Sequence, residues 1–169
     1  MRLRASVRSG EPGKTSGDKA VIVVLDTNHF RELVEDGQMG RRLLARIDER
    51  RADVFTCVVA AEETLRGWFA LLSRKQPGHD QLHAYFELKR SIETLAHFDL
   101  LGFDAEAADC FVRLRRQLPR LGTMDLKIAA ICIAHDASLL SRPFDCAQGT
   151  RNLVDFNQIP GLRVENWLE

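Results

Sequence analysis

Acidic residues at four places in this chain have the types and settings that suit metal binding. The first is Asp26, which directly follows the apolar run at residues 21–25 and precedes Thr27 and Asn28. Such a run of β-branched and large apolar residues predicts a strand buried on both faces. In open parallel sheets, chemistry collects beyond the carboxyl ends of the strands. The residues leave two interpretations open: Asp26 caps the next helix, or it holds a metal.

Two adjacent glutamates follow in a segment with helical periodicity, residues 58–72. At 100° per residue, Glu62 borders the apolar stripe and is placed to pair with Arg66 at position i+4. Glu63 lies further round, beside Gly67, whose missing side chain leaves room for a ligand. On this evidence Glu63 is either a solvated helix charge or a metal ligand.

The remaining acids are Asp125 and Asp155. Asp125 follows Thr123 in the first turn of an apolar helix, where the helix dipole favours the ionised form of a carboxylate. Asp155 lies close to Asn152, beyond the fourth predicted strand. Each also has a structural interpretation, Asp125 as a first-turn helix charge and Asp155 as a loop or capping residue.

The hydrophobic pattern predicts a fold that brings these acids together. Strands are predicted at residues 21–25, 54–56, 97–101, 138–141 and 162–164, with helical segments between them. Strands alternating with helices predict an α/β fold, here a three-layer α/β/α sandwich with a parallel sheet of about four to five strands. Parallel strands end at one edge of the sheet, so acids that follow them gather there.

The predicted helices have recognisable ends and inward faces. The predicted helices span residues 28–36, 39–50, 58–72, 81–95, 105–118 and 124–135. Asp104 and Thr123 are the expected N-caps of the last two. A stripe that includes Val58, Trp68 and Phe69 is the expected buried face of the third.

Length and composition indicate one globular domain in a reducing compartment. The chain has 169 residues, 45% of them hydrophobic and 28% charged. Its formal net charge of zero excludes wholesale coating of nucleic acid, so any such contact uses local basic patches. The four cysteines, Cys57, Cys110, Cys132 and Cys146, lack metal-finger spacing, and three lie in apolar contexts. We expect a cytoplasmic protein with no membrane span.

The first 19 residues are expected to form a disordered N-terminal tail, because they are polar and lack periodicity. The tail contains Gly13, Lys14 and Thr15, an order typical of phosphate-binding loops. That interpretation fails, because Arg8 stands where the motif needs a glycine and no strand precedes it.

Taken together, the acids and their flanking residues resemble the PIN domain of metal-dependent ribonucleases. The resemblance is closest to VapC-type toxins of type II bacterial toxin–antitoxin pairs. It rests on residues 23–29, 62–68, 121–130, 152–156 and 160–167 and covers roughly residues 21–169. The block around Asp125 is its most specific part. The expected organisation is therefore a tail at 1–19 and a PIN-like nuclease domain at 20–169.

The resemblance implies a Mg²⁺- or Mn²⁺-dependent endoribonuclease with an RNA substrate, a cognate antitoxin partner and a homodimeric state. The implied metal ligands and catalytic residues are Asp26, Glu63, Asp125 and Asp155. Glu63 is selected over Glu62 because the acid of the family motif stands four positions before a glycine. The implied orienting donors are Thr27, Asn28, Thr123 and Asn152, and the candidate RNA contacts are Arg66 and Arg151. Oxygen-only ligands agree with a hard cation.

The chain departs from the family pattern at residues 143–151, where an insertion separates Ser141 and Arg142 from Asn152. We expect a surface loop close to the site. The insertion keeps a catalytically silent PIN-like domain, binding RNA or protein, open as an alternative. A non-toxin PIN nuclease of RNA processing is the other alternative.

Two further groups of residues are weaker candidates. His79 and His83 are four residues apart, which suits two zinc ligands, but the glutamate of a zinc-protease motif is missing between them. Arg113, Arg116 and Arg120 are expected along one helix edge, either as a solvated face or as phosphate contacts.

Overall fold

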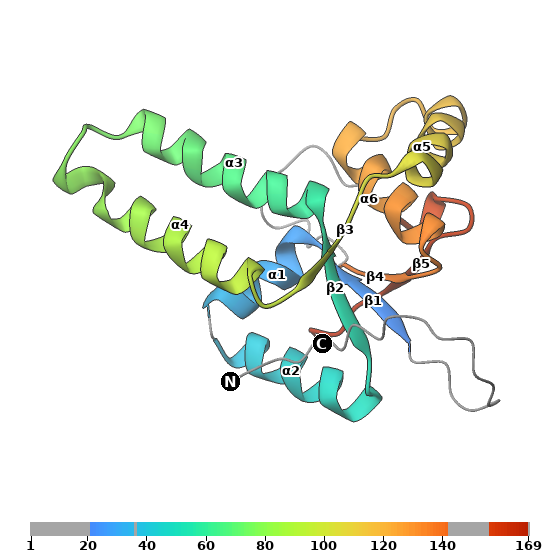
Figure 1. The fold of residues 1–169 in the computed structure, drawn as a ribbon, viewed down its shortest axis with the longest axis horizontal. Helices are drawn as coiled ribbons and strands as arrows, with labels where there is room; N and C mark the ends of the chain where they lie inside the picture. Colours follow the sequence, from blue (N-terminus) through green and yellow to red (C-terminus); the bar gives the residue numbers. More distant parts are fainter. Residues whose placement is uncertain (1–20, 36, 142–155, 169) are drawn as a thin grey trace.

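In the part of the chain that the structure describes, a five-stranded parallel sheet forms the centre of the molecule (Figure 1). The computed structural model describes residues 21–35, 37–141 and 156–168. The strand order is β3-β2-β1-β4-β5. The strands are β1 Ile22–Leu25, β2 Asp53–Cys57, β3 Asp99–Leu101, β4 Ser138–Leu140 and β5 Arg163–Glu165. The predicted α/β class and parallel sheet are confirmed.

Some predicted features lie outside the described residues. These are the tail at residues 1–19, the insertion at 143–151 and Cys146. Three of the expected site residues, Arg151, Asn152 and Asp155, also lie outside them. All of these stay predictions.

Strand β1 is buried on both faces, as its apolar run predicts. Val23, Val24 and Leu25 have no exposed surface, and β1 pairs with β2 on one side and with β4 on the other. Because side chains alternate along a strand, Val24 joins one hydrophobic core while Val23 and Leu25 join the other. Each face of the sheet therefore needs its own cover of helices.

Helices cover both faces of the sheet, which gives the expected three layers (Figure 1). Residues of α1 and α2 share a core with Val23 and Leu25, whereas residues of α3, α5 and α6 share the other core with Val24. The helices are α1 Thr27–Glu35, α2 Gln38–Arg50, α3 Val58–Arg74, α4 Leu82–Leu95, α5 Ala105–Gln117 and α6 Thr123–Ala134, with 3₁₀ turns η1 His79–Gln81 and η3 Phe156–Gln158. Among the described residues, no helix combines the length and apolarity needed to cross a membrane.

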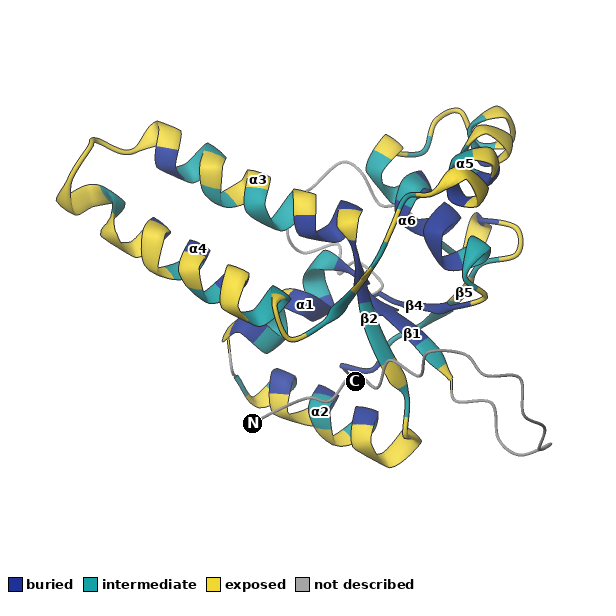
Figure 2. Cartoon of the chain, in the orientation of Figure 1, coloured by how far each residue is buried: buried dark blue, intermediate teal, exposed yellow. Residues whose placement is uncertain are grey.

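Helices α3 and α4 run out from the sheet as a two-helix arm whose outer surface is largely exposed (Figure 2). The arm has its own small core of Leu72, Ala84 and Leu88. The predicted stripe on α3 is wrong at Val58 and Phe69, which are 39% and 56% exposed. The first turn of α3 packs into the sheet core through Val59 and Ala60, whereas the outer turns face α4. One periodic stripe cannot describe both contacts.

The three described cysteines, Cys57, Cys110 and Cys132, are buried free thiols, which confirms their apolar settings. Burial raises the pKa of the Cys57 and Cys132 thiols, so both are held as neutral thiols at physiological pH. Cys57 also caps α3, because its sulfur accepts a hydrogen bond from the Ala60 N–H at 3.5 Å.

Gly40 on α2 lies directly against the backbone of α1. A Cβ atom at this position would lie 2.4 Å from the carbonyl oxygen of Glu32. We expect Gly40→Ala to destabilise the protein by about 1–3 kcal/mol, because the two helices must move apart. Urea denaturation measures the loss.

The matched control is Gly67→Ala, since an added Cβ there meets open space inside α3. Helix propensity alone predicts a gain of up to about 1 kcal/mol for this change. If both substitutions change the free energy of unfolding in the same direction, the close packing of α1 on α2 is not the reason for a glycine at position 40.

Candidate metal centre

Asp26 ends the central strand and is 5% exposed. Its Oδ1 atom accepts a hydrogen bond from the backbone N–H of His29 at 2.7 Å, so the carboxylate caps α1. Its Oδ2 atom accepts a hydrogen bond from the Ser141 hydroxyl at 2.7 Å. Capping does not prevent metal binding, because a carboxylate has about four lone pairs.

The bond between Asp26 and Ser141 lies where the strand order reverses. After β1 the chain adds β2 and β3 on one side of it, and later adds β4 and β5 on the other. Asp26 directly follows β1, and Ser141 directly follows β4. Open α/β sheets bind their ligands at such a switch point, beyond the carboxyl ends of the strands.

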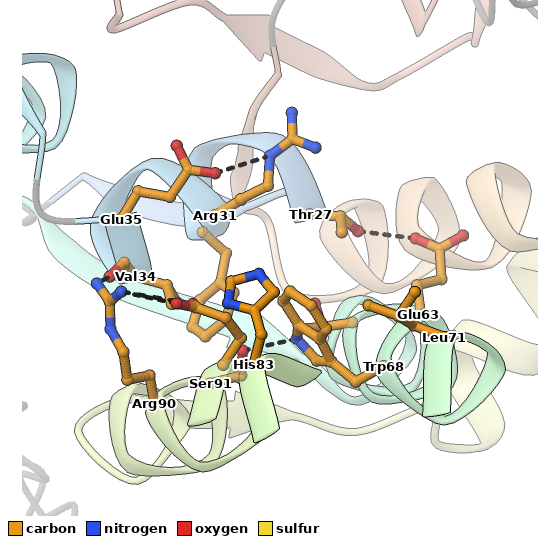
Figure 3. A pocket seen from close by; sticks show the side chains of 14 residues that line it. Thr27, Arg31, Val34, Glu35, Glu63, Trp68, Leu71, His83, Arg90 and Ser91 are labelled. Atoms are coloured by element: carbon orange, nitrogen blue, oxygen red, sulfur yellow. Dashed lines mark hydrogen bonds and ion pairs between the residues drawn. The ribbon is translucent and has the colours of Figure 1, made fainter. Parts of the chain in front are cut away.

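Glu63 lies in the second turn of α3 and reaches across to α1 (Figure 3). Its Oε2 atom accepts a hydrogen bond from the Thr27 hydroxyl at 2.8 Å. Burial raises the pKa of Glu63, and the negative charges of Asp125 and Asp26 raise it further, although the Thr27 bond acts in the opposite direction. Glu63 therefore lies in an environment that disfavours its own charge.

Asp125 lies in the first turn of α6. Burial raises the pKa of its carboxyl group, and the charge of Asp26 adds to this, although a bond from its own backbone N–H lowers it. The helix dipole predicts an easily ionised group here, but burial outweighs that effect. The carboxylate folds over Gly122, since a Cβ atom on that glycine would lie 2.3 Å from Asp125 Oδ2.

Arg115 on α5 holds the turn that leads into α6. Its guanidinium group donates to the carbonyl oxygen of Leu121 at 2.8 Å and to the hydroxyl of Thr123 at 2.7 Å. The prediction that Thr123 caps α6 is wrong: Thr123 is the first helical residue, and Gly122 precedes it without a side-chain cap. The Thr123 hydroxyl instead accepts a hydrogen bond from Arg115, and this contact fixes the first turn of α6, which carries Asp125.

Asp26, Glu63 and Asp125 thus come from separate parts of the chain to one place, where the charge of Asp26 raises the pKa of both Glu63 and Asp125. Carboxylate oxygens suit Mg²⁺ or Mn²⁺, and a cation offsets repulsion between them. Within the described residues, no three His, Cys, Asp or Glu side chains already converge to hold a metal ion. The donors fit a hard cation chemically, and closing on one requires their side chains to move closer together.

The other predicted candidates lie in different settings. Asn28 is half-buried in the first turn of α1. Glu62 forms an exposed ion pair with Arg66, as their helical spacing predicts. Arg66 therefore lies on the surface of α3, one helical turn after Glu62.

The weaker candidates do not assemble a site. His79 lies in η1 and His83 in α4, and no third ligand joins them among the described residues. Arg113 and Arg116 are exposed on α5, but Arg120 lies beyond the end of that helix. The expected row of three on one helix edge is therefore wrong.

Sequence reasoning misses two residues that contact Asp26, namely Ser141 and His29. A signal for Ser141 exists, because β4 pairs with β1 in parallel and both strands end at the same edge. His29 occupies the third helical position after the cap, where its backbone N–H is expected to bond Asp26. The approach of its ring to the carboxylate, at 3.1 Å, has no sequence signal.

A pocket of about 470 Å³ lies between α1, α3 and α4 (Figure 3). Thr27 and Glu63 belong to its lining, so it adjoins the carboxylates. Most of the wall is apolar and includes Phe30, Trp68 and Leu71. Arg31 and Arg90 also line it, but each forms an ion pair with an acid on its own helix. The pocket therefore offers mainly apolar contact beside a carboxylate.

We expect Glu63→Gln to raise the Tm of the metal-free protein by a few degrees near neutral pH. A raised pKa means that ionised Glu63 lowers native stability. The loss of stability from ionised Glu63 is complete above its raised pKa in the native state, and it is absent below the ordinary pKa of glutamate. Calorimetry in EDTA should therefore show the gain at about pH 7.5 and lose it at about pH 4. An equal gain at both pH values contradicts an electrostatic cause.

We expect Gly122→Ala to weaken Mn²⁺ binding while the protein stays folded. The new methyl group takes the place of Asp125 Oδ2, and the end of a side chain shifts more easily than backbone. Isothermal titration should show an affinity loss on the order of 10-fold. Gly102→Ala is the control, since nothing lies within 4 Å of its added Cβ. Unchanged affinity in Gly122→Ala argues against Asp125 as a ligand.

Solved structures share this fold at low sequence identity. A chain of VapBC2 from Rickettsia felis, bound to a promoter DNA fragment, aligns with a TM-score of 0.63 and 21% identity over 87% of this chain and 99% of that chain. DNA-bound VapBC from Salmonella typhimurium aligns with a TM-score of 0.64 and 21% identity over 87% and 98%. VapBC-5 from Mycobacterium tuberculosis, of a family of toxin–antitoxin systems, aligns with a TM-score of 0.53 and 25% identity over 86% and 97%.

No curated protein matches the chain. The PIN domain family matches residues 23–145, which is more than half of its length. The matched range contains Asp26, Glu63 and Asp125, the three carboxylates that the fold brings together. On this match and on its fold, the chain belongs to the PIN domain family.

Proposed function

We propose that this protein is a Mg²⁺- or Mn²⁺-dependent endoribonuclease that hydrolyses RNA phosphodiester bonds as the toxin of a toxin–antitoxin pair. The observation that carries the proposal is the gathering of Asp26, Glu63 and Asp125 at the strand-order switch point. Burial and the nearby charge of Asp26 disfavour ionised Glu63 and Asp125, and a cation would offset this cost. Membership of the PIN domain family supports a nuclease.

The acids divide the work with their hydroxyl partners. Asp26, Glu63 and Asp125 would hold the cation, and Asp155 is proposed as a fourth ligand from its place in the sequence motif. When bound, such a cation would supply Lewis-acid chemistry that activates a water for attack on the phosphodiester and stabilises the leaving oxygen. Ser141 orients Asp26, and Thr27 orients Glu63, through the hydrogen bonds they donate. Because the 2′-hydroxyl of the RNA takes no part, the products carry 5′-phosphate and 3′-hydroxyl ends.

Arg66 and Arg151 are proposed as contacts to the RNA backbone. The side chain of Arg66 is 65% exposed, and its guanidinium group pairs with Glu62 on the surface of α3. Surface ion pairs contribute about 0–1 kcal/mol, so Arg66 can leave Glu62 for a phosphate at little cost.

The toxin role rests on the structural relatives, which are parts of toxin–antitoxin complexes. The proposal therefore includes a cognate antitoxin as a protein partner, a homodimer and a cytoplasmic location. A non-toxin nuclease of RNA processing would use the same acids. A silent PIN-like domain would keep the fold and cleave nothing.

Cleavage of single-stranded RNA by the purified full chain with Mn²⁺ tests the enzyme. We expect Asp26→Asn to reduce the rate more than about 100-fold, since losing a ligand exceeds the 10- to 100-fold effect typical of residues that only orient one. Glu63→Gln should act similarly. The amide keeps the shape of the side chain, so circular dichroism should show an intact fold.

Glu62→Gln is the matched control on the same helix. We expect its rate to stay within about threefold of the wild type, because it removes only a surface ion pair. A folded wild type that cleaves no RNA with either metal overturns the nuclease proposal. Cleavage without growth arrest when the chain is expressed in bacteria would favour RNA processing over a toxin.

A further inference from the structure

His29 is fully buried, with 0% of its surface exposed, in the first turn of α1. Its neighbours in the core are apolar, and Phe30 and Trp167 are 1% exposed. Burying an imidazole among apolar side chains is unfavourable unless its nitrogens find partners. An aliphatic residue would fill the space without that penalty, so the polar contacts of His29 need an explanation.

Both ring nitrogens of His29 have partners. Nδ1 lies 3.1 Å from Asp26 Oδ1, and the backbone N–H of Trp167 donates to Nε2 over 3.5 Å. A backbone N–H is only a donor, so Nε2 must carry the lone pair. Nδ1 then carries the proton and donates it to the Asp26 carboxylate. The opposite tautomer would set a lone pair against the carboxylate and a proton against the Trp167 N–H.

We propose that His29, as its Nδ1–H tautomer, is the positioning residue of Asp26, held in that tautomer by the C-terminal segment at Trp167. The inference rests on the proposed function in one respect, that Asp26 is a metal ligand. Oδ1 receives the ring N–H and the His29 backbone N–H, while Oδ2 receives the Ser141 hydroxyl. These three donors fix the rotation of the carboxylate, and residues that hold a ligand in this way typically change metal affinity 10- to 100-fold.

The tautomer can be read directly from the metal-free full-length protein. A long-range ¹H–¹⁵N correlation spectrum, assigned with the His29→Asn variant, separates protonated from unprotonated ring nitrogens. We expect a protonated Nδ1 and an unprotonated Nε2 at His29. A protonated Nε2 overturns the inference, whatever the activity of the protein.

Two substitutions separate positioning from packing. His29→Phe fills the space but donates nothing, and we expect its Mn²⁺ affinity by isothermal titration to fall about 10- to 100-fold. In His29→Asn the side-chain amide takes the place of Nδ1–H, so we expect affinity within about threefold of the wild type. The inference fails if His29→Phe binds Mn²⁺ like the wild type, or if His29→Asn loses as much affinity as His29→Phe.

Two controls complete the experiment. Ile47→Ala removes a side chain from the same core, which should lower Tm without changing Mn²⁺ affinity. Asp26→Asn tests the proposed function separately: wild-type Mn²⁺ affinity in that variant would refute Asp26 as a ligand. The tautomer measurement on the wild type stands even then, and it also decides the matter if His29→Phe does not fold.

Discussion

The burial of β1 on both faces determines where charge can gather in this molecule. Val23, Val24 and Leu25 have no exposed surface, and Asp26 is the first residue after them, at the carboxyl end of the strand. The hydrogen bond from Ser141 ties that carboxylate to the neighbouring strand. Helices α3 and α6, which carry the other two acids, pack on the face of the sheet that Val24 presents. The positions of the three carboxylates are therefore all defined relative to one apolar strand.

The carboxylate centre lowers the stability of the fold that builds it. Burial disfavours the ionised forms of Glu63 and Asp125, and the negative charge of Asp26 adds to this at both residues. Strain and repulsion of this kind persist only where the surrounding structure holds the groups in place. Here the two cores on either side of β1, together with the contacts of Arg115 and Thr27, supply that restraint. A site that repels itself is well suited to bind a cation, because binding removes the repulsion.

The sequence predicts those parts of the structure that depend on local pattern. The apolar run of β1, the parallel sheet and the N-cap at Asp104, which accepts from the Ala107 N–H at 2.9 Å, follow from neighbouring residues. The cap expected at Thr123 fails because Arg115, from another helix, takes the hydroxyl. His29 and Ser141 escape prediction because their roles depend on the register of β4 and on the path of the C-terminal segment. The residue pattern of a single segment shows neither that register nor that path.

The contacts that complete the centre join distant parts of the chain. The bond from Ser141 to Asp26 spans 115 positions, and the bond from Trp167 to His29 spans 138. Contacts of such separation form late in folding, because closing a long loop is entropically unfavourable. During synthesis Asp26 leaves the ribosome long before Ser141 is made, so the nascent chain has the carboxylate without its partner. The Asp26 carboxylate therefore lacks the Ser141 hydroxyl until β4 has been made and has paired with β1.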